Sequence, residues 1–219
     1  MQTPSPIELV RRLDLTLARP EATRRDLEAL CAAARAGRGH SFGGSSSRVE
    51  LARTLLDNSE VRVTGLVGFP LGAAEADAKR YETEVAVDLG AQEIETVLNI
   101  GRLKDGDHRY VLRELRDIAE AADEQPVKVI LETSLLTPEE RTLACSLALD
   151  SGVHCVCTGT GVTAATVEDV RSLRAAVGEK FGVKAAGFSD LPTALALVEA
   201  GASRLGTADG VAVLSSLSQ

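Results

Sequence analysis

Short apolar runs alternate along the chain with longer stretches in which apolar positions recur at helical spacing. The runs are rich in β-branched residues, which is typical of parallel strands that are buried on both faces. The pattern predicts eight strands, at residues 13–17, 40–42, 61–67, 93–98, 127–131, 153–158, 183–186 and 203–205.

The stretches between these runs carry signals for the starts and stops of helices. Residues 137–140 combine a capping threonine, a proline at the first helical position and a glutamate that reaches back to the cap. Residues 166–169 repeat the arrangement with an aspartate, and Gly178 follows as a stop signal. A further helix is predicted over residues 73–89, where Gly90 ends it.

This alternation predicts the fold class. Eight strand–helix units in 219 residues favour a closed (β/α)8 barrel, the TIM barrel, over an open doubly wound sheet, which the pattern alone leaves as the alternative. No linker, low-complexity tract or break in composition divides the sequence. We therefore expect a single TIM-barrel domain over residues 1–219.

Composition argues against several classes of function. The net charge is −8, and the chain has no Trp, two Tyr and four Phe, whereas nucleic-acid binding needs basic clusters and stacking rings. No apolar run approaches the ~20 residues of a membrane span, and the first residues lack the features of a secretory signal. We expect a cytoplasmic protein that binds neither nucleic acid nor a membrane.

The cysteines and histidines give no sign of a disulfide framework or a metal site. Cys31, Cys145, Cys155 and Cys157 are scattered, as free thiols are, and the three histidines form no ligand spacing with them. We expect no metal and no cofactor. The oligomeric state stays open, a homo-oligomer included.

Six segments carry motifs that are specific enough to indicate a family. They appear in order across nearly the whole chain, at residues 13–17, 68–72, 93–101, 127–133, 182–185 and 201–207. In these segments the chain resembles the deoxyribose-phosphate aldolases. The resemblance implies a class I aldolase barrel that needs no cofactor and has its site at the carboxyl ends of the strands.

The resemblance also implies roles for three positions. Glu95 stands where the family has an aspartate that moves protons with a water, and Lys184 matches a second lysine that lowers the pKa of the imine-forming one. The imine-forming lysine itself is replaced by Cys157, within Cys-Val-Cys-Thr-Gly-Thr-Gly at residues 155–161. A thiol cannot form an imine, so the family's mechanism cannot run unchanged. Lys184, Glu95 and Cys157 are the catalytic candidates.

Other departures lie where the family binds phosphate. Bulky Phe188 replaces a glycine, an arginine is missing from the same loop, and Asp209 introduces a carboxylate into the loop after the last strand. A carboxylate about 4 Å from a phosphate would weaken binding by roughly 4 kcal/mol at an effective dielectric near 20. We therefore expect an unphosphorylated substrate. The substrate-binding candidates are Lys128, Thr16, Thr158, Gly187, Gly206 and Asp209.

Each candidate also has a plainer interpretation. Lys184 would be a lysine that reaches the surface, Glu95 an ion-paired glutamate, and Cys157 a lining residue or inert filler rather than a nucleophile activated by Lys184. Lys128 would form a buried ion pair with Glu132, four residues along on the same strand face. Asp209 would turn outward or cap a helix.

Three functions remain open at this point. The first is a cofactor-free lyase, or carbon–carbon-bond-forming enzyme, acting on a small carbonyl compound through Lys184 and Glu95. The second is an isomerase, dehydratase or cyclase on a sugar-like compound that uses acid–base groups without an imine. The third is a catalytically inactive barrel that serves as a binding subunit, because the fold alone does not decide the chemistry.

Overall fold

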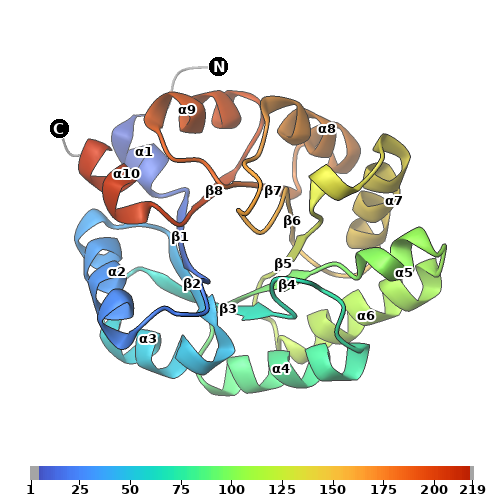
Figure 1. The fold of residues 1–219 in the computed structure, drawn as a ribbon, viewed down its shortest axis with the longest axis horizontal. Coiled ribbons are helices and arrows are strands. Elements are labelled where there is room, and N and C mark those ends of the chain that lie inside the picture. The colour runs from blue at the N-terminus through green and yellow to red at the C-terminus, as the bar shows by residue number, and fades with distance from the viewer. Residues whose placement is uncertain (1–4, 218–219) are drawn as a thin grey trace.

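A computed structural model describes residues 5–217, and it shows a closed barrel of eight parallel strands that follow one another in chain order (Figure 1). The open doubly wound alternative is thereby excluded, since β8 pairs with β1. The strands are β1 (Leu13–Leu17), β2 (Ser41–Ser45), β3 (Arg62–Val67), β4 (Glu93–Val97), β5 (Val127–Ile130), β6 (Cys155–Cys157), β7 (Gly182–Ala186) and β8 (Arg204–Thr207).

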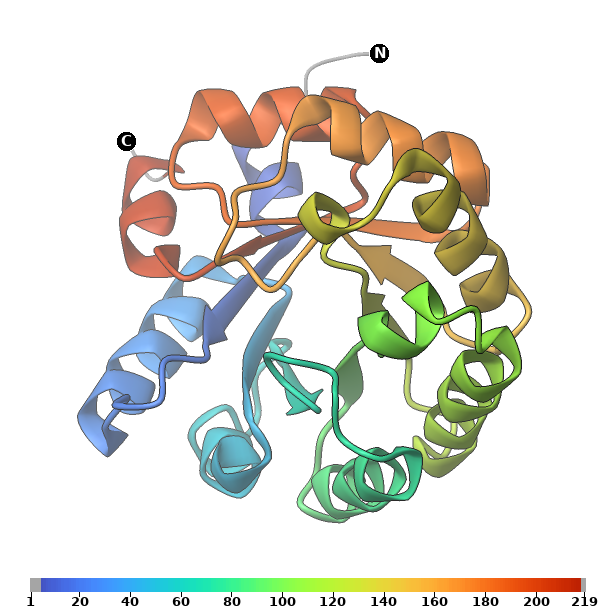
Figure 2. The same ribbon diagram turned by 45° about the vertical axis from the view of Figure 1, so that its right-hand side comes forward.

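Helices surround the barrel as an outer ring (Figures 1 and 2). They are α1 (Pro6–Val10), α2 (Arg24–Gly37), α3 (Val49–Leu55), α4 (Ala76–Asp88), α5 (Ile100–Lys104), α6 (His108–Ala121), α7 (Pro138–Leu149), α8 (Val167–Val177), α9 (Leu191–Glu199) and α10 (Gly210–Leu217), with 3-10 turns η1 (Ser46–Arg48) and η2 (Thr133–Leu135). No helix within residues 5–217 is long and apolar enough to cross a membrane.

The helix signals in the sequence are confirmed where they are strongest. Thr137 and Thr166 each cap a helix, and each forms a reciprocal capping box with the acidic residue three positions on. Gly178 ends α8 with a positive φ of 74°. The predicted helix over 73–89 begins later, at Ala76, because Glu75 acts as its N-cap.

The second strand differs most from its prediction. It runs over Ser41–Ser45 rather than 40–42, and its later positions are Gly43 and Gly44, which carry no apolar signal. Both neighbours hold this segment in the sheet, since β1 pairs with it on one side and β3 on the other. Tertiary pairing thus makes a strand that intrinsic propensity disfavours.

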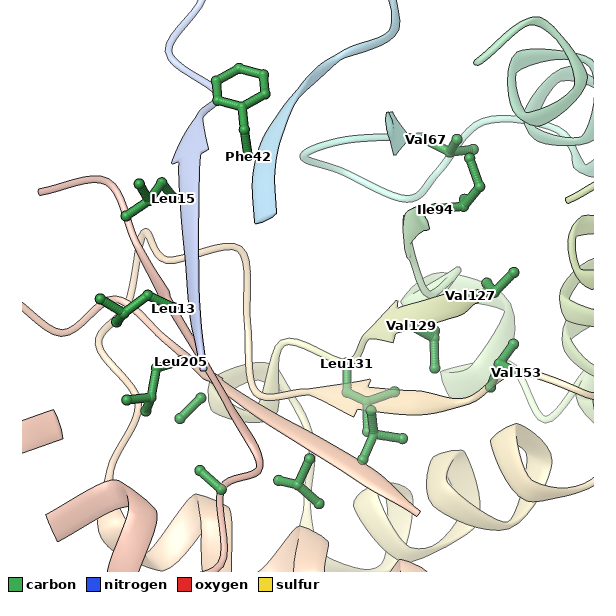
Figure 3. Packing of buried hydrophobic residues seen from close by; sticks show 14 of the residues in the cluster. Leu13, Leu15, Phe42, Val67, Ile94, Val127, Val129, Leu131, Val153 and Leu205 are labelled. Carbon is green, nitrogen blue, oxygen red and sulfur yellow. The ribbon is translucent and has the colours of Figure 1, made fainter. Parts of the chain in front are cut away.

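The barrel divides the buried side chains into two compartments. Strand residues that point outward, such as Leu13, Ile94 and Val129, join one large apolar cluster with the helices (Figure 3). The residues that alternate with them point inward, and many are charged, including Asp14, Glu95 and Lys128. The apolar core is therefore a layer between strands and helices, while the inside of the barrel is largely polar.

Candidate functional site

A cavity of about 550 Å³ opens at the carboxyl ends of the strands. This is the end of the barrel where the loops after the strands meet, and where active sites of TIM barrels lie. The cavity is lined by segments 16–20, 159–162, 186–188 and 206–209, together with Leu66, Phe69, Pro70, Glu95 and Lys184. Its volume suits a small molecule.

Lys184 and Glu95 form a buried pair of charges in the cavity wall. Lys184 Nζ lies 2.8 Å from Glu95 Oε1 and 2.6 Å from Oε2, so the carboxylate holds the ammonium with both oxygens. Both side chains are almost completely buried. Among the described residues, Lys184 is the only lysine that lines this cavity. A carboxylate in direct contact with a lysine can exchange a proton with it.

A third group, Asp14 on β1, completes the surroundings of Lys184. Its Oδ2 lies 3.3 Å from Lys184 Nζ and 3.1 Å from Lys128 Nζ, while its Oδ1 accepts a hydrogen bond from Ser41 and binds Arg204. Asp14 was not among the predicted site residues. Its signal in the sequence is a carboxylate at an inward position of an otherwise apolar strand.

These charges set the protonation of the site. Burial lowers the pKa of Lys184, but the carboxylates of Glu95 and Asp14 outweigh burial and hold its pKa above the ordinary value. Burial raises the pKa of Asp14, but Lys128, Lys184 and Arg204 outweigh burial and hold it well below the ordinary value. Without ligand, Lys184 is therefore an ammonium and Asp14 a carboxylate.

Gly206 makes room for Lys184. A Cβ at this position would lie 2.6 Å from Lys184 Cε, which is closer than carbon atoms approach. Gly206 also lines the cavity, and its lack of a side chain lets the lysine extend toward Glu95.

Lys128 does not have the surroundings expected from the sequence. Its Nζ lies 2.7 Å from Glu93, 3.1 Å from Asp14 and 3.7 Å from Glu95, so the expected pair with Glu132 is wrong. Glu132 lies beyond the end of β5 with a left-handed backbone, and its carboxylate accepts a hydrogen bond from the Thr160 amide. Lys128 does not line the cavity, which places it behind Lys184 rather than against a substrate.

The surroundings of Cys157 do not favour a thiolate nucleophile. It is completely buried in an inner cluster with Val97, Ile130 and Cys155, and it does not line the cavity. Burial, the contact with Cys155 and the charge of Glu95 raise the pKa of the thiol well above its ordinary value, and Lys184 offsets this only in part. Of the interpretations of Cys157, inert filler fits these surroundings.

The remaining predicted binding residues divide between two cavities. Thr16, Gly187 and Asp209 line the cavity that holds Lys184. Thr158 lines a second cavity of about 350 Å³ between the loops after β5 and β6, and its hydroxyl accepts a hydrogen bond from the Ala186 amide.

Two further residues that line the first cavity were not among the predicted site residues. Phe69 lies in the loop after β3, and Arg19 lies in the loop after β1. The Arg19 guanidinium lies 3.3 Å from Glu21 and 2.7 Å from Asp26, which compensate its charge. Nothing in the spacing of Arg19 marks it as a site residue, since its position depends on the loop.

Metal ligation has no candidate in the part of the chain that the structure describes. No group of three or more His, Cys, Asp or Glu side chains within residues 5–217 has the geometry to hold an ion.

Comparisons with known proteins find relatives that match nearly the whole chain. The chain is 43% identical over 211 residues to the deoxyribose-phosphate aldolase of Bdellovibrio bacteriovorus, covering 95% of this chain and 96% of that protein. It is 44% identical over 214 residues to deoxyribose-phosphate aldolase 1 of Bacillus licheniformis, covering 96% of each. No family model matches the sequence.

Solved structures show the same barrel. The deoxyribose phosphate aldolase from Aeropyrum pernix, described as a unique tetrameric structure, superposes with a TM-score of 0.90 at 28% identity. The match covers 98% of this chain and 93% of that one.

Proposed function

Because this chain belongs to the deoxyribose-phosphate aldolase family, a family of lyases, we propose that it is a carbon–carbon lyase for a small carbonyl compound. In this proposal Lys184 supplies the amine that forms an imine, and Glu95 moves the protons. The observation that carries it is the position of Lys184, the one cavity-lining lysine of residues 5–217, in contact with both oxygens of Glu95.

The chemistry can be written with these two groups. Lys184 passes a proton to Glu95, and the neutral amine attacks the substrate carbonyl. Glu95 returns this proton to the oxygen that leaves as water, which gives an iminium ion. When the bond between the α and β carbons breaks, its electrons flow into the iminium to give an enamine. The β-hydroxyl passes its proton to the Glu95 carboxylate as it becomes a carbonyl. Protonation of the enamine and addition of water release the second product and restore the lysine.

A second candidate is isomerisation or dehydration without an imine. The observation that favours it is that the pKa of Lys184 lies above the ordinary value. Burial lowers this pKa, but the carboxylates of Glu95 and Asp14 outweigh the effect of burial. Lys184 would then remain a cation that stabilises an enolate, and Glu95 would move the proton.

Reductive trapping tests the proposal and separates the two candidates. The protein would be incubated with a panel of small aldehydes and borohydride, and the intact mass and the modified peptide would be measured. We expect an adduct on Lys184 that is absent from Lys184→Met. An active substrate that leaves no adduct on Lys184 would favour the second candidate.

We further propose that the substrate carries no phosphate at the end of the cavity near β8. Asp209 and Phe188 both line this part, and a carboxylate there disfavours a dianion. Since Cys157 also stands where the family has its imine-forming lysine, turnover of 2-deoxyribose 5-phosphate should be at least ~10³-fold below that of the aldolase relatives, a difference of about 4 kcal/mol in the barrier.

The control for this expectation is Asp209→Ser. The variant should bind a phosphorylated compound more tightly than the wild type does in calorimetry, while its affinity for the matched unphosphorylated compound should change little. Tight binding of a sugar phosphate to the wild type would contradict the proposal.

We also propose that the chain forms a homo-oligomer, as the relative from Aeropyrum pernix does. Light scattering during size-exclusion chromatography measures the mass directly, and a monomer across micromolar concentrations would refute this.

A further inference from the structure

We infer that Lys128 is a positioning residue that occupies the carboxylates around Lys184, so that the Lys184 ammonium gives up its proton to Glu95 more readily. This inference rests on the proposed function, since it concerns the amine that would form the imine. Lys128 acts from behind the site, because it does not line the cavity.

The two lysines share their carboxylates. Asp14 Oδ2 lies 3.1 Å from Lys128 Nζ and 3.3 Å from Lys184 Nζ, and Glu95 Oε2 lies 3.7 Å from the first and 2.6 Å from the second. An anion that stabilises two cations stabilises each less than it would stabilise one alone, and the two cations also repel each other. Both effects disfavour the charged form of Lys184.

Among residues 5–217, the charged and titratable groups around Lys184 come from five strands. Glu95 on β4 and Asp14 on β1 bind it, while Cys157 on β6 is its neighbour in the ladder. Lys128 on β5 opposes it through the shared carboxylates. Arg204 on β8 binds Asp14 Oδ1 through Nε at 3.2 Å and so competes for the same carboxylate.

Lys128 is itself held as a cation by a carboxylate that Lys184 does not contact. Glu93 Oε2 lies 2.7 Å from Lys128 Nζ, and Glu93 is further bound by His40, Arg62 and Thr64. Lys128 can therefore keep its charge while Lys184 loses its own. This asymmetry makes Lys184, and not Lys128, the amine that becomes neutral.

The test measures the pH dependence of Lys184 labelling with acetaldehyde and borohydride, resolved by peptide mass spectrometry. In Lys128→Met the midpoint of the labelling profile should rise by about one pH unit or more, which lowers labelling about tenfold at a pH below the midpoint. Lys128→Arg keeps the charge and should stay within about threefold of the wild type. Lys180→Met, at an exposed position, is the control and should leave the profile unchanged.

A charge-balanced variant guards against misfolding. Lys128→Met with Glu93→Gln removes one cation and one anion from the barrel interior, and it should show the same upward shift as Lys128→Met. Folding of every variant would be checked by its thermal transition. A folded variant without Lys128 that labels Lys184 with the wild-type profile overturns the inference. Absence of any Lys184 adduct in the wild type instead overturns the imine mechanism, so the two failures are distinct.

Discussion

The absence of a side chain at Gly206 is a feature of the site, because it leaves the space that Lys184 occupies. Lys184 extends to Glu95 across the space that a Cβ on Gly206 would fill, 2.6 Å from the lysine Cε. Gly206 is not one of the described glycines with a positive φ. The need for glycine here therefore arises from the neighbouring Lys184 side chain and not from the backbone conformation.

Gly206→Ala should therefore slow the reductive trapping of Lys184, and its effect on the free energy of unfolding should be smaller. The added methyl group displaces the lysine from Glu95, and we expect at least ~10-fold slower reductive trapping, equivalent to about 1.4 kcal/mol. Peptide mass spectrometry measures the trapping. Gly101→Ala is the matched control, because its Cβ would have its nearest neighbour at 3.8 Å. Equal trapping in both variants would show that Lys184 is not confined by Gly206.

The sequence predicted some residues of the site and not their partners. Glu95 and Lys184 were predicted because they occupy positions of the family's motifs. Asp14 was missed although it bridges Lys184 and Lys128, since contacts between β1 and β5 depend on barrel closure and not on local spacing. Lys128 was paired with the wrong carboxylate for the same reason.

Two helices are joined by a buried ion pair that the sequence analysis passed over. Lys79 on α4 is completely buried, and its Nζ lies 2.8 Å from Glu114 on α6. The same ammonium donates to the Val97 carbonyl at the end of β4, two residues from Glu95. The pair thus fixes α4 and α6 to the strand that carries Glu95.

Lys79→Met should be strongly destabilising, because it leaves the Glu114 carboxyl buried without its partner. We expect a loss of about 3–5 kcal/mol in the free energy of unfolding, measured with urea. Lys79→Met combined with Glu114→Met removes both charges and should recover most of the loss. A single variant within about 1 kcal/mol of the wild type would show that the pair is not coupled to the fold.

The molecule as a whole encloses a balanced set of charges. Asp14, Glu93 and Glu95 face Lys128, Lys184 and Arg204 inside the barrel, and each of these cations lies within 3.3 Å of at least one carboxylate oxygen. The alternation of strands and helices favoured the closed barrel over an open doubly wound sheet. It was not enough to predict this network, since its members come from strands that are distant in sequence.

The network makes part of the free energy of unfolding depend on pH. The pKa of Asp14 is raised by burial but lowered further by Lys128, Lys184 and Arg204, and it ends well below the ordinary value. A carboxylate with a lowered pKa stabilises the fold above its unfolded pKa of about 3.9, and that contribution is lost as pH falls toward the folded pKa.

Asp14→Asn should test this linkage. The variant should be less stable than the wild type by about 3–5 kcal/mol at pH 7, because buried cations lose a partner. The difference should stay constant down to about pH 5 and shrink below about pH 4, as the wild type loses its own advantage. Urea unfolding across this range measures it, and a difference that does not change with acid would contradict the assignment.

The separation of an apolar outer layer from a polar interior has a consequence for how such a protein can change over evolution. Packing between strands and helices carries most of the hydrophobic stabilisation, while the groups that do chemistry lie on the other face of the same strands. An exchange at an inward position, such as cysteine at 157, therefore leaves the outer layer intact. New reactions can be tried in the interior while the scaffold that folds the chain stays the same.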